Sequence, residues 1–495
     1  MTCSAATDRP LTIVLAGVLI YLVGLLCFFP DVIIQYDEAR YLEMAYAFSK
    51  GLPCLNEIDP LSGEVWCNRS SPFLPGTSAL LAPAVALFGW RGAYLVSPLA
   101  LAAATLCTAL WLREAGRSPL FALMVLGYLP SLVLGRVAQS DVPATALAAL
   151  GLWLFWASGP DRRVRWAASG FVAGLSLSVR ETNALLFAPL YLGALIRRER
   201  GTGALIAGGL VGSLLWPLGT WIVFGDPFYI YRRSWVTLTL ANVPGNLPLY
   251  TVALLFFIPG GLIAALLYRG ERWPEVVATV LLFCALYLSF GYRGENSGLL
   301  RSMILGPRFF SPLTPLLAFA AAEAFPRIRA AIRQPLGIGG AEAMERIASL
   351  GVRLWVAGVL VVAFAVHPIL DQFTERLNQF RKAIYDHSAD GSVVVIPWLE
   401  QELVKPMFGA RLRFYFNALT PEMLDGLLAR HGTITVVLLD RRHSPYLRGA
   451  ARENQERLNS LARRAKFELV FDSGGEASER LRIWHVSARS RDNDR

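Results

Sequence analysis

Apolar runs long enough to cross a lipid bilayer recur along this chain from Leu11 to Leu370, and short clusters of arginine separate them. About 20 apolar residues suffice for one helical crossing of the hydrocarbon core. The first run, Leu11–Pro30, lacks a small-residue cleavage site, so it is predicted to be a retained helix rather than a removed signal peptide. Most of the chain is therefore expected to lie in a membrane.

The arginine clusters orient the predicted helices. The positive-inside rule places them in the cytoplasm, and they lie around Arg113, Arg162, Arg197, Arg269 and Arg327. Each of four long apolar stretches predicts two helices, and these stretches are Pro119–Ser158, Trp166–Ile196, Thr202–Tyr268 and Pro274–Phe325. Single helices at the first run, at Gly92–Leu112 and at Val352–Leu370 bring the prediction to about eleven transmembrane helices.

Residues 1–380 are predicted to form the transmembrane domain, and residues 31–90 its first outer loop with juxtamembrane segments. Within this loop Pro72–Trp90 is apolar enough to cross, but its prolines and glycines weaken a helix. A full crossing would also move every later arginine cluster outside. This segment is therefore predicted to be re-entrant or to lie on the outer surface.

Residues 381–495 have the pattern of a separate soluble domain, in which strands and helices alternate. Strands are predicted at Ser392–Pro397, Arg411–Phe416, Thr433–Asp440, Phe467–Phe471 and Leu481–Val486. Helices are predicted at Pro421–Arg430 and Ala451–Lys466. The alternation predicts a small α/β domain with a mainly parallel sheet. The expected fold class is an α-helical polytopic membrane protein with a C-terminal extracytoplasmic α/β domain.

Composition supports the membrane class. The 495 residues are 54% hydrophobic and only 17% charged, whereas soluble proteins carry roughly a quarter charged residues. The formal net charge of +10 comes almost wholly from arginine. In a membrane protein such an excess indicates cytoplasmic anchoring, so no nucleic-acid partner is expected.

Two of the six cysteines, Cys54 and Cys67, fall in the first outer loop. A disulfide between them would stabilise that loop by about 3 kcal/mol in the loop-entropy model, and an oxidising compartment would favour it. The sequence leaves open whether this bond forms. No cysteine or histidine spacing indicates a structural zinc site.

Ionisable residues gather at the predicted outer tips, against the positive-inside pattern. Charges at membrane depth are costly and by default mark function or a paired partner. Arginines there could bind a lipid phosphate through two parallel hydrogen bonds, and acids could act as a general base or hold a divalent cation. The set comprises Asp37, Glu38, Arg40, Arg69, Arg136, Asp141, Arg180, Glu181, Arg232, Arg233, Arg293, Glu295, Arg301 and Arg308.

Five short motifs in this set carry a resemblance. Tyr36-Asp37-Glu38-Ala39-Arg40-Tyr41 resembles the Asp-Glu motif of GT-C glycosyltransferases, which are membrane enzymes that use polyprenyl-phosphate-linked sugars. It is most similar to the branch of the lipid A aminoarabinose transferases and, more distantly, the protein O-mannosyltransferases. Further similarities follow in the expected order at Ser71-Pro72, Arg136-Val-Ala-Gln-Ser-Asp141, Ser178-Val-Arg180-Glu181 and Gly306-Pro-Arg308-Phe-Phe-Ser-Pro312.

The resemblance implies a role for each matched residue. Asp37 takes the place of the catalytic acid/base, with Glu38 beside it to assist or to orient the acceptor. Arg40 and Tyr41 are expected to contact the donor phosphate, and Asp141 to position the site or share a cation. Arg180, where lysine is usual, lies with Glu181 in a substrate-binding motif, Arg69 would replace the lysine absent before Pro72, and Arg308 opens a late helix.

The reaction implied by the resemblance is inverting sugar transfer from a polyprenyl-phosphate donor to a hydroxyl group. The acceptor would be a lipid, a glycan or a protein. The protein is expected to be multi-pass in an inner or plasma membrane, with its C-terminal domain periplasmic or extracellular. The sequence does not identify a metal, although the acids make a divalent cation one candidate cofactor.

Structural explanations exist for each residue. Asp37 and Glu38 could cap a helix over Glu38–Lys50, and Asp141 could cap the next helix. Arg180 and Glu181 could pair with each other, while Arg308 could anchor its helix at the headgroups. A secondary transporter or a non-catalytic membrane scaffold for envelope glycan assembly are the alternative functions. Against a transporter, no duplicated half is detected and the polar groups are predicted at outer tips rather than at mid-membrane.

Overall fold

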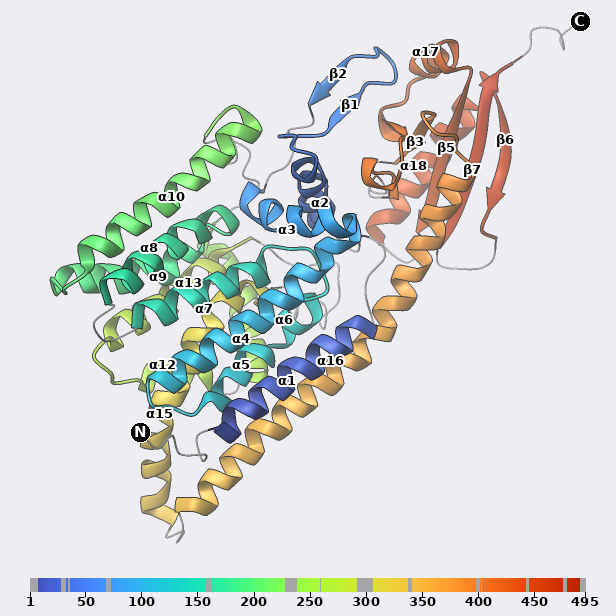
Figure 1. The fold of residues 1–495 in the computed structure, drawn as a ribbon. Coiled ribbons are helices and arrows are strands. Elements are labelled where there is room, and N and C mark those ends of the chain that lie inside the picture. Colours follow the sequence, from blue (N-terminus) through green and yellow to red (C-terminus); the bar gives the residue numbers. More distant parts are fainter. Residues whose placement is uncertain are drawn as a thin grey trace, which may run out of the picture. The chain divides into compact units, whose positions relative to one another are not determined.

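The computed structural model describes residues 8–27, 33, 36–67, 73–156, 162–227, 238–258, 260–291, 306–336, 341–397, 401, 403–441, 445–474 and 479–489. The chain divides into two compact units (Figure 1). The helical unit comprises Met1–Pro30 and Pro72–Leu370, and the α/β unit comprises Asp31–Ser71 and Asp371–Arg495. Residues 31–71, expected as an outer loop of the transmembrane domain, thus cluster with the C-terminal residues.

The helical unit is built almost wholly of helices. Its first half contains α1 (Asp8–Cys27), α3 (Pro75–Phe88), η2 (Trp90–Leu95), α4 (Val96–Glu114), η3 (Pro119–Ala122), α5 (Leu123–Leu126), α6 (Leu129–Leu134) and α7 (Asp141–Trp156). Its second half contains α8 (Arg162–Val179), α9 (Asn183–Ile196), α10 (Thr202–Phe224), α11 (Val243–Phe257), α12 (Gly261–Leu267), α13 (Trp273–Ser289), η6 (Pro307–Leu313) and α15 (Thr314–Leu336). The last helix, α16 (Ala341–Asp386), continues into the α/β unit.

Three helical segments of the described chain are long and apolar enough to cross a membrane: Trp90–Glu114, Thr202–Phe224 and Pro307–Ile328. Five shorter apolar helices accompany them: Arg9–Leu25, Pro75–Phe88, Asp141–Trp156, Asn183–Ile196 and Trp273–Ser289. The predicted total of about eleven crossings therefore stays a prediction.

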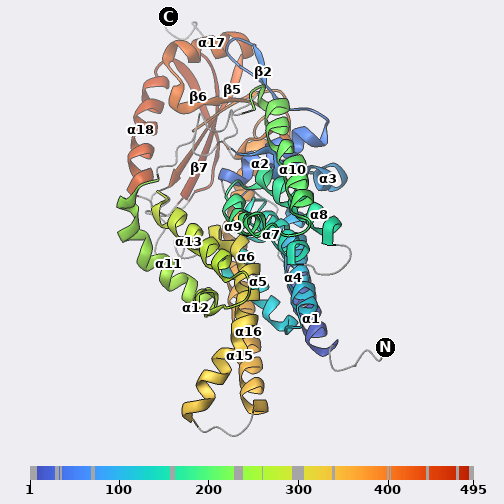
Figure 2. The same ribbon diagram turned by 90° about the vertical axis from the view of Figure 1, so that its left-hand side faces the viewer.

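Two of the predicted hairpins bring their own helices together, α6 with α7 and α8 with α9, whereas α10 packs mainly against α8 and α15 against α12 (Figures 1 and 2). The stretch Trp166–Ile196 forms two short helices, α8 and α9, as expected. The first half of Pro119–Ser158 instead breaks into η3, α5 and α6, because Gly127 and Pro130 interrupt the helical hydrogen bonds.

Packing against the core distinguishes the helices of this unit. Trp111 of α4 stacks on Phe319 of α15 with ring centroids 4.2 Å apart. In α10, by contrast, only 17% of the most apolar stretch of the helix is buried. Large side chains such as Leu210 and Trp221 are exposed. Where α10 touches α8, a Cβ at Gly170 would collide with the Leu205 carbonyl, so glycine permits the close approach.

The α/β unit contains a five-stranded sheet in the order β4-β3-β5-β7-β6. The strands are β3 (Val393–Ile396), β4 (Leu412–Tyr415), β5 (Thr433–Arg441), β6 (Ala465–Asp472) and β7 (Glu479–Ala488), and the helices are α2 (Tyr36–Ser49), α17 (Pro421–His431) and α18 (Pro445–Leu461). All five predicted strands and both predicted helices are confirmed. The expectation of a mainly parallel sheet is wrong, since β5–β7 and β6–β7 are antiparallel. The last two strands follow each other across a short connection, which permits antiparallel pairing only.

Alternation along β3 explains the three layers of this domain. Val393 and Val395 pack in one apolar cluster with residues of α17 and α18, while Val394 and Ile396 pack in another with Phe380 and Ile384 of α16. Because successive side chains of a strand point to opposite faces, a fully apolar strand must be covered on both sides. The last turns of α16 thus cover the face opposite α17 and α18.

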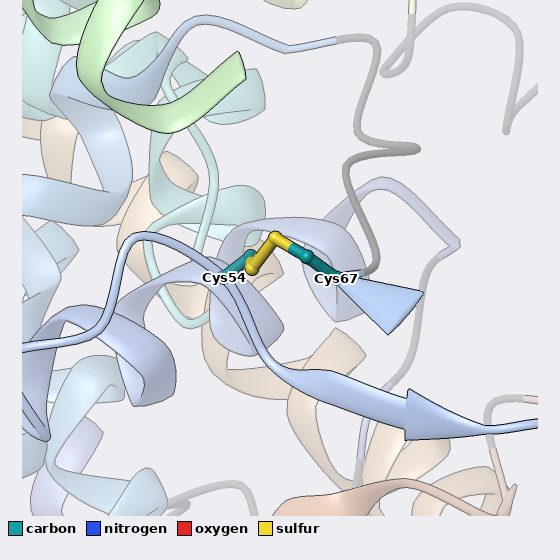
Figure 3. The surroundings of a disulfide bond; sticks show 2 residues. All are labelled: Cys54 and Cys67. Carbon is teal, nitrogen blue, oxygen red and sulfur yellow. A yellow bond between two sulfur atoms is a disulfide. The ribbon is translucent and has the colours of Figure 1, made fainter. Parts of the chain in front are cut away.

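A second, two-stranded sheet follows α2. It consists of β1 (Asn56–Ile58) and β2 (Val65–Cys67), paired antiparallel, and the sequence did not predict it. The disulfide that the sequence left open is present, and it joins Cys54 to Cys67 at the open end of this hairpin (Figure 3). The hairpin tip contacts α17, where Arg430 donates to the Leu61 carbonyl at 3.0 Å.

Candidate active site

The acidic pair Asp37-Glu38 lies in the first turn of α2. Acids in this position interact favourably with the helix N-terminus, as the structural explanation requires. Capping acids, however, normally stay in water, whereas the exposed fraction is 0% for Glu38 and 6% for both Arg40 and Tyr41. Asp37 is half-buried. Because buried charges need partners, this first turn does more than cap a helix.

One turn further along α2, Glu43 is the centre of a buried ion cluster. Its Oε2 accepts a hydrogen bond from Arg40 Nη1 at 3.1 Å, and its Oε1 lies 2.9 Å from Lys405 Nζ. Arg413 Nη1 lies 4.0 Å from the same oxygen, and Arg413 Nη2 donates to Glu57 Oε1 at 2.6 Å. These five residues are called the Glu43 cluster below.

The charge of Glu43 is set by its neighbours. Burial alone would raise the pKa of Glu43, but the positive charges of Lys405, Arg40 and Arg413 outweigh burial and lower the pKa below its ordinary value. Glu43 is therefore a firmly ionised carboxylate, suited to holding cations in place and unsuited to donating a proton near neutral pH.

Three of the sequence motifs meet in the helical unit. Arg180 Nη1 donates to Asp141 Oδ1 at 2.6 Å, and Arg308 Nε lies 3.9 Å from Asp141 Oδ2. All three side chains are almost completely buried. This Asp141 cluster places two guanidinium groups against one carboxylate, an arrangement that favours a further anion.

Polar and aromatic neighbours fix the two arginines. Arg180 also donates to Ser140 Oγ at 3.3 Å, Thr182 Oγ1 at 3.2 Å and the Tyr287 hydroxyl at 3.4 Å. Arg308 donates to Gln139 Oε1 at 3.1 Å. Both guanidinium carbons lie near the Phe309 ring, at 5.1 Å for Arg180 and 4.9 Å for Arg308, within the range of a cation–π contact.

Helix ends position these side chains. Asp141 is the first residue of α7, Arg180 follows directly after α8, and Arg308 lies in η6. The backbone turns sharply after α8, where the Asn183 amide donates to the Arg180 carbonyl at 3.1 Å. Charged residues at helix ends can approach one another, while the apolar helix interiors remain free of charge.

The geometry disagrees with two of the structural explanations, the pairing of Arg180 with Glu181 and the anchoring of Arg308 at the headgroups. Arg180 pairs with Asp141, and the Glu181 side chain beside it is exposed. Arg308 is buried against Gln139 and Asp141 rather than extended along the surface of its helix.

The structure places the remaining predicted residues as follows. Arg136, between α6 and α7, has an exposed fraction of 1%. Asp37, Glu38, Arg40 and Tyr41 share one helix of the α/β unit. Arg69 lies outside the described residues, as do Arg232, Arg233, Arg293, Glu295 and Arg301.

Sequence reasoning missed several members of these clusters. Tyr287 lies in no motif, and Gln139 lies inside the Arg136–Asp141 motif without a predicted role. Lys405 and Arg413 lie far along the chain from Glu43. The spacing of Arg40 and Glu43, three residues apart in a predicted helix, was the one available signal, because such residues face each other on a helix.

The acids and other metal-ligating side chains form no group of three that could hold a metal ion within the described parts of the chain. A divalent cation therefore stays a prediction of the sequence.

Known proteins resemble this chain in structure only. No family model matches the sequence, and no curated protein matches it. The solved structure of ArnT from Cupriavidus metallidurans bound to undecaprenyl phosphate superposes with a TM-score of 0.65 and 15% sequence identity, over 97% of this chain and 98% of that chain. The chain has the ArnT fold.

The apo structure of ArnT agrees, with a TM-score of 0.62 over the same shares of both chains. ArnT is a lipid A aminoarabinose transferase of the GT-C class. The resemblance inferred from five short motifs is thus confirmed at the level of the fold, across the α/β unit as well as the helical one.

Proposed function

We propose that this protein is a membrane glycosyltransferase that moves a sugar from a polyprenyl-phosphate donor to a hydroxyl acceptor at the outer face of an inner or plasma membrane. One observation carries the proposal: Asp141, Arg180 and Arg308, taken from three separate motifs, converge in a chain with the ArnT fold. The solved ArnT binds undecaprenyl phosphate, and paired guanidinium groups suit such a phosphate monoester.

In the proposed reaction Asp37 acts as the general base. Its carboxylate takes the proton of the acceptor hydroxyl, whose oxygen attacks C1 of the sugar from the face opposite the leaving group. The bond between C1 and the phosphate oxygen breaks, and its electron pair leaves with the polyprenyl phosphate. The configuration at C1 inverts, and the proton passes from Asp37 to solvent.

The arginines supply the second requirement, a stabilised leaving group. Negative charge grows on the phosphate as the bond to the sugar breaks, and preformed donors that meet this charge lower the barrier. Arg180 and Arg308, oriented by Asp141, are assigned this task. By the resemblance, Arg40 and Tyr41 contact the donor phosphate and Glu38 orients the acceptor. The resemblance also assigns Arg69 and Glu181 to substrate binding.

Covalent product formation tests the function. Purified full-length protein in proteoliposomes is incubated with polyprenyl-phosphate-linked hexoses and pentoses and with extracted membrane lipids and glycans, and products are identified by mass spectrometry. A glycosylated acceptor and released polyprenyl phosphate are expected, and Asp37→Asn should abolish both. Movement of a sugar across the vesicle membrane without a new bond would indicate the transporter alternative. If neither a product nor sugar movement is found, the scaffold alternative is supported.

A further inference from the structure

The Glu43 cluster joins three segments of the α/β unit that are distant in sequence. Arg40 and Glu43 come from α2, Glu57 from β1, and Arg413 from β4. Lys405 directly precedes the short helix η8 (Pro406–Phe408), which packs against α2. The cluster thus connects α2, its following hairpin and the C-terminal sheet through charged groups.

Burial makes each member of the cluster depend on the others. The Lys405 side chain has an exposed fraction of 0%, and the side chains of Arg40, Glu43 and Arg413 are also buried. Removing one partner from such a cluster leaves an uncompensated charge in a poorly solvated place. The orientation of the Arg40 guanidinium is therefore tied to Glu43, and that of Glu43 to Lys405.

The C-terminal part of the α/β unit holds Lys405 and Arg413 independently of α2. The Tyr385 hydroxyl donates to the Lys405 carbonyl at 3.1 Å from the end of α16, and Arg413 lies within the parallel pair β3–β4. The Cys54–Cys67 disulfide closes the hairpin, and the ion pair of Glu57 with Arg413 joins the hairpin to β4.

We propose that Glu43 and Lys405 are positioning residues, through which the C-terminal α/β domain orients Arg40 toward the donor phosphate. This inference rests on the proposed function, because it takes Arg40 as a phosphate contact. Glu43 accepts from one edge of the guanidinium group and so fixes the direction of its other donors, as an acid that orients a metal-bound or catalytic histidine does. The C-terminal domain thereby becomes part of the donor site without touching the donor.

The alternative is that the Glu43 cluster only stabilises packing. Both explanations predict some loss of stability on mutation. They differ in coupling, because a positioning residue acts on phosphate binding only through Arg40, whereas a packing residue acts independently of it.

The decisive measurement is the Kd of purified full-length protein in nanodiscs for undecaprenyl phosphate, with undecaprenol as the ligand that lacks the phosphate. Glu43→Gln should weaken undecaprenyl phosphate binding by about tenfold, the usual scale for a lost charge-assisted hydrogen bond, and should leave undecaprenol binding unchanged. In an Arg40→Lys background the further effect of Glu43→Gln should fall below about twofold.

A second pair of variants covers the case in which Glu43→Gln does not fold. Lys405→Met removes the charge that holds Glu43 and should weaken binding about as much as Glu43→Gln, while Lys405→Arg should retain most of the affinity. Asp425→Asn is the matched control, since it breaks an exposed ion pair of the same domain with Arg464 at 3.3 Å. It should leave the Kd unchanged.

Three outcomes would overturn the inference. If Glu43→Gln and Arg40→Lys change the Kd for undecaprenyl phosphate independently, so that their effects multiply, the cluster serves packing only. The same conclusion follows if no variant changes the Kd. Equal weakening for undecaprenol would show that the phosphate is not involved. Failure of the proposed function is recognised separately. Wild-type protein that binds undecaprenyl phosphate but forms no glycosylated product would contradict the transferase reaction. The coupling between Glu43 and Arg40 in phosphate binding could still be measured.

Discussion

The Asp141 cluster and the Glu43 cluster are built differently. In the Asp141 cluster one carboxylate meets two arginines among hydroxyl and aromatic side chains, and all residues come from helix ends. In the Glu43 cluster two carboxylates, from α2 and the hairpin, meet three cations from α2, the residue before η8 and β4. Under the two proposals, the first cluster receives an anion and the second orients Arg40 of α2.

Neither cluster contains the proposed base. Asp37 lies nearly two turns before Glu43 on the same helix and is half-buried. A general base must exchange protons with its substrate, and a carboxylate clamped between cations cannot do so readily. In the proposed function, proton transfer therefore belongs to Asp37 and charge stabilisation to the arginines.

The largest expected effect concerns that assignment. Asp37→Asn should lower kcat by about 10²- to 10⁴-fold, the usual contribution of a general base, while Kd for undecaprenyl phosphate stays within about threefold. Initial rates in proteoliposomes and the binding assay measure the two quantities, with Asp425→Asn as control. Full activity in the Asp37→Asn protein would remove it as the base.

Next in size is the loss of the shared carboxylate of the Asp141 cluster. Asp141→Ala leaves Arg180 and Arg308 facing each other in a buried place, which should lower the free energy of unfolding by about 3–5 kcal/mol. Undecaprenyl phosphate should restore more stability to this variant than to wild type, because the phosphate replaces the lost anion. Thermal unfolding in detergent, with and without the ligand, measures both effects. Equal stabilisation of the two proteins would argue against an anion site at the two arginines.

Removal of the disulfide tests how much this bond stabilises the β1–β2 hairpin. Replacing both Cys54 and Cys67 by serine should lower the free energy of opening this hairpin by about 3 kcal/mol in the loop-entropy model. Hydrogen exchange of full-length protein measures the effect in β1 and β2, with α10 as an internal reference. Exchange that rises equally in both places would mean global rather than local loosening.

The smallest expected effect is a pH dependence of stability, caused by an ion pair at the edge of the C-terminal sheet. Hydrogen bonds from Arg480 lower the pKa of Asp472 to about 2, against about 3.9 in an unfolded chain. The resulting stability is fully present above pH 4 or so and is lost as the pH falls toward the folded pKa. Since the pair is partly exposed, the contribution should stay below about 1 kcal/mol. Asp472→Asn should abolish this part of the pH dependence, as unfolding curves between pH 5 and pH 2 would record; an unaltered curve would contradict it.

Local patterns were sufficient to predict most elements of the fold. Five strands and two helices of the C-terminal domain, and the paired helices α8 and α9, follow from hydrophobic periodicity and the turn between them. The sheet's mixed direction did not follow, since strand pairing depends on how short the connection between β6 and β7 is. The broken helices α5 and α6 were also missed, because several glycines and prolines share one apolar stretch.

The candidate site shows the same division. Short motifs singled out Asp141, Arg180 and Arg308 because charge is conspicuous in an apolar chain. Lys405 and Arg413 gave no such signal, since cations are unremarkable in the sequence of a soluble domain.

The amino-acid sequence by itself determined where apolar helices and alternating strands form, and which charged residues stand out, because both depend on the order of neighbouring side chains. Only the tertiary structure decided which charges meet: Arg180 with Asp141, and Lys405 with Glu43. Pairing across long stretches of chain depends on the path of the backbone between the partners. That path results from many weak packing interactions, which no single motif predicts.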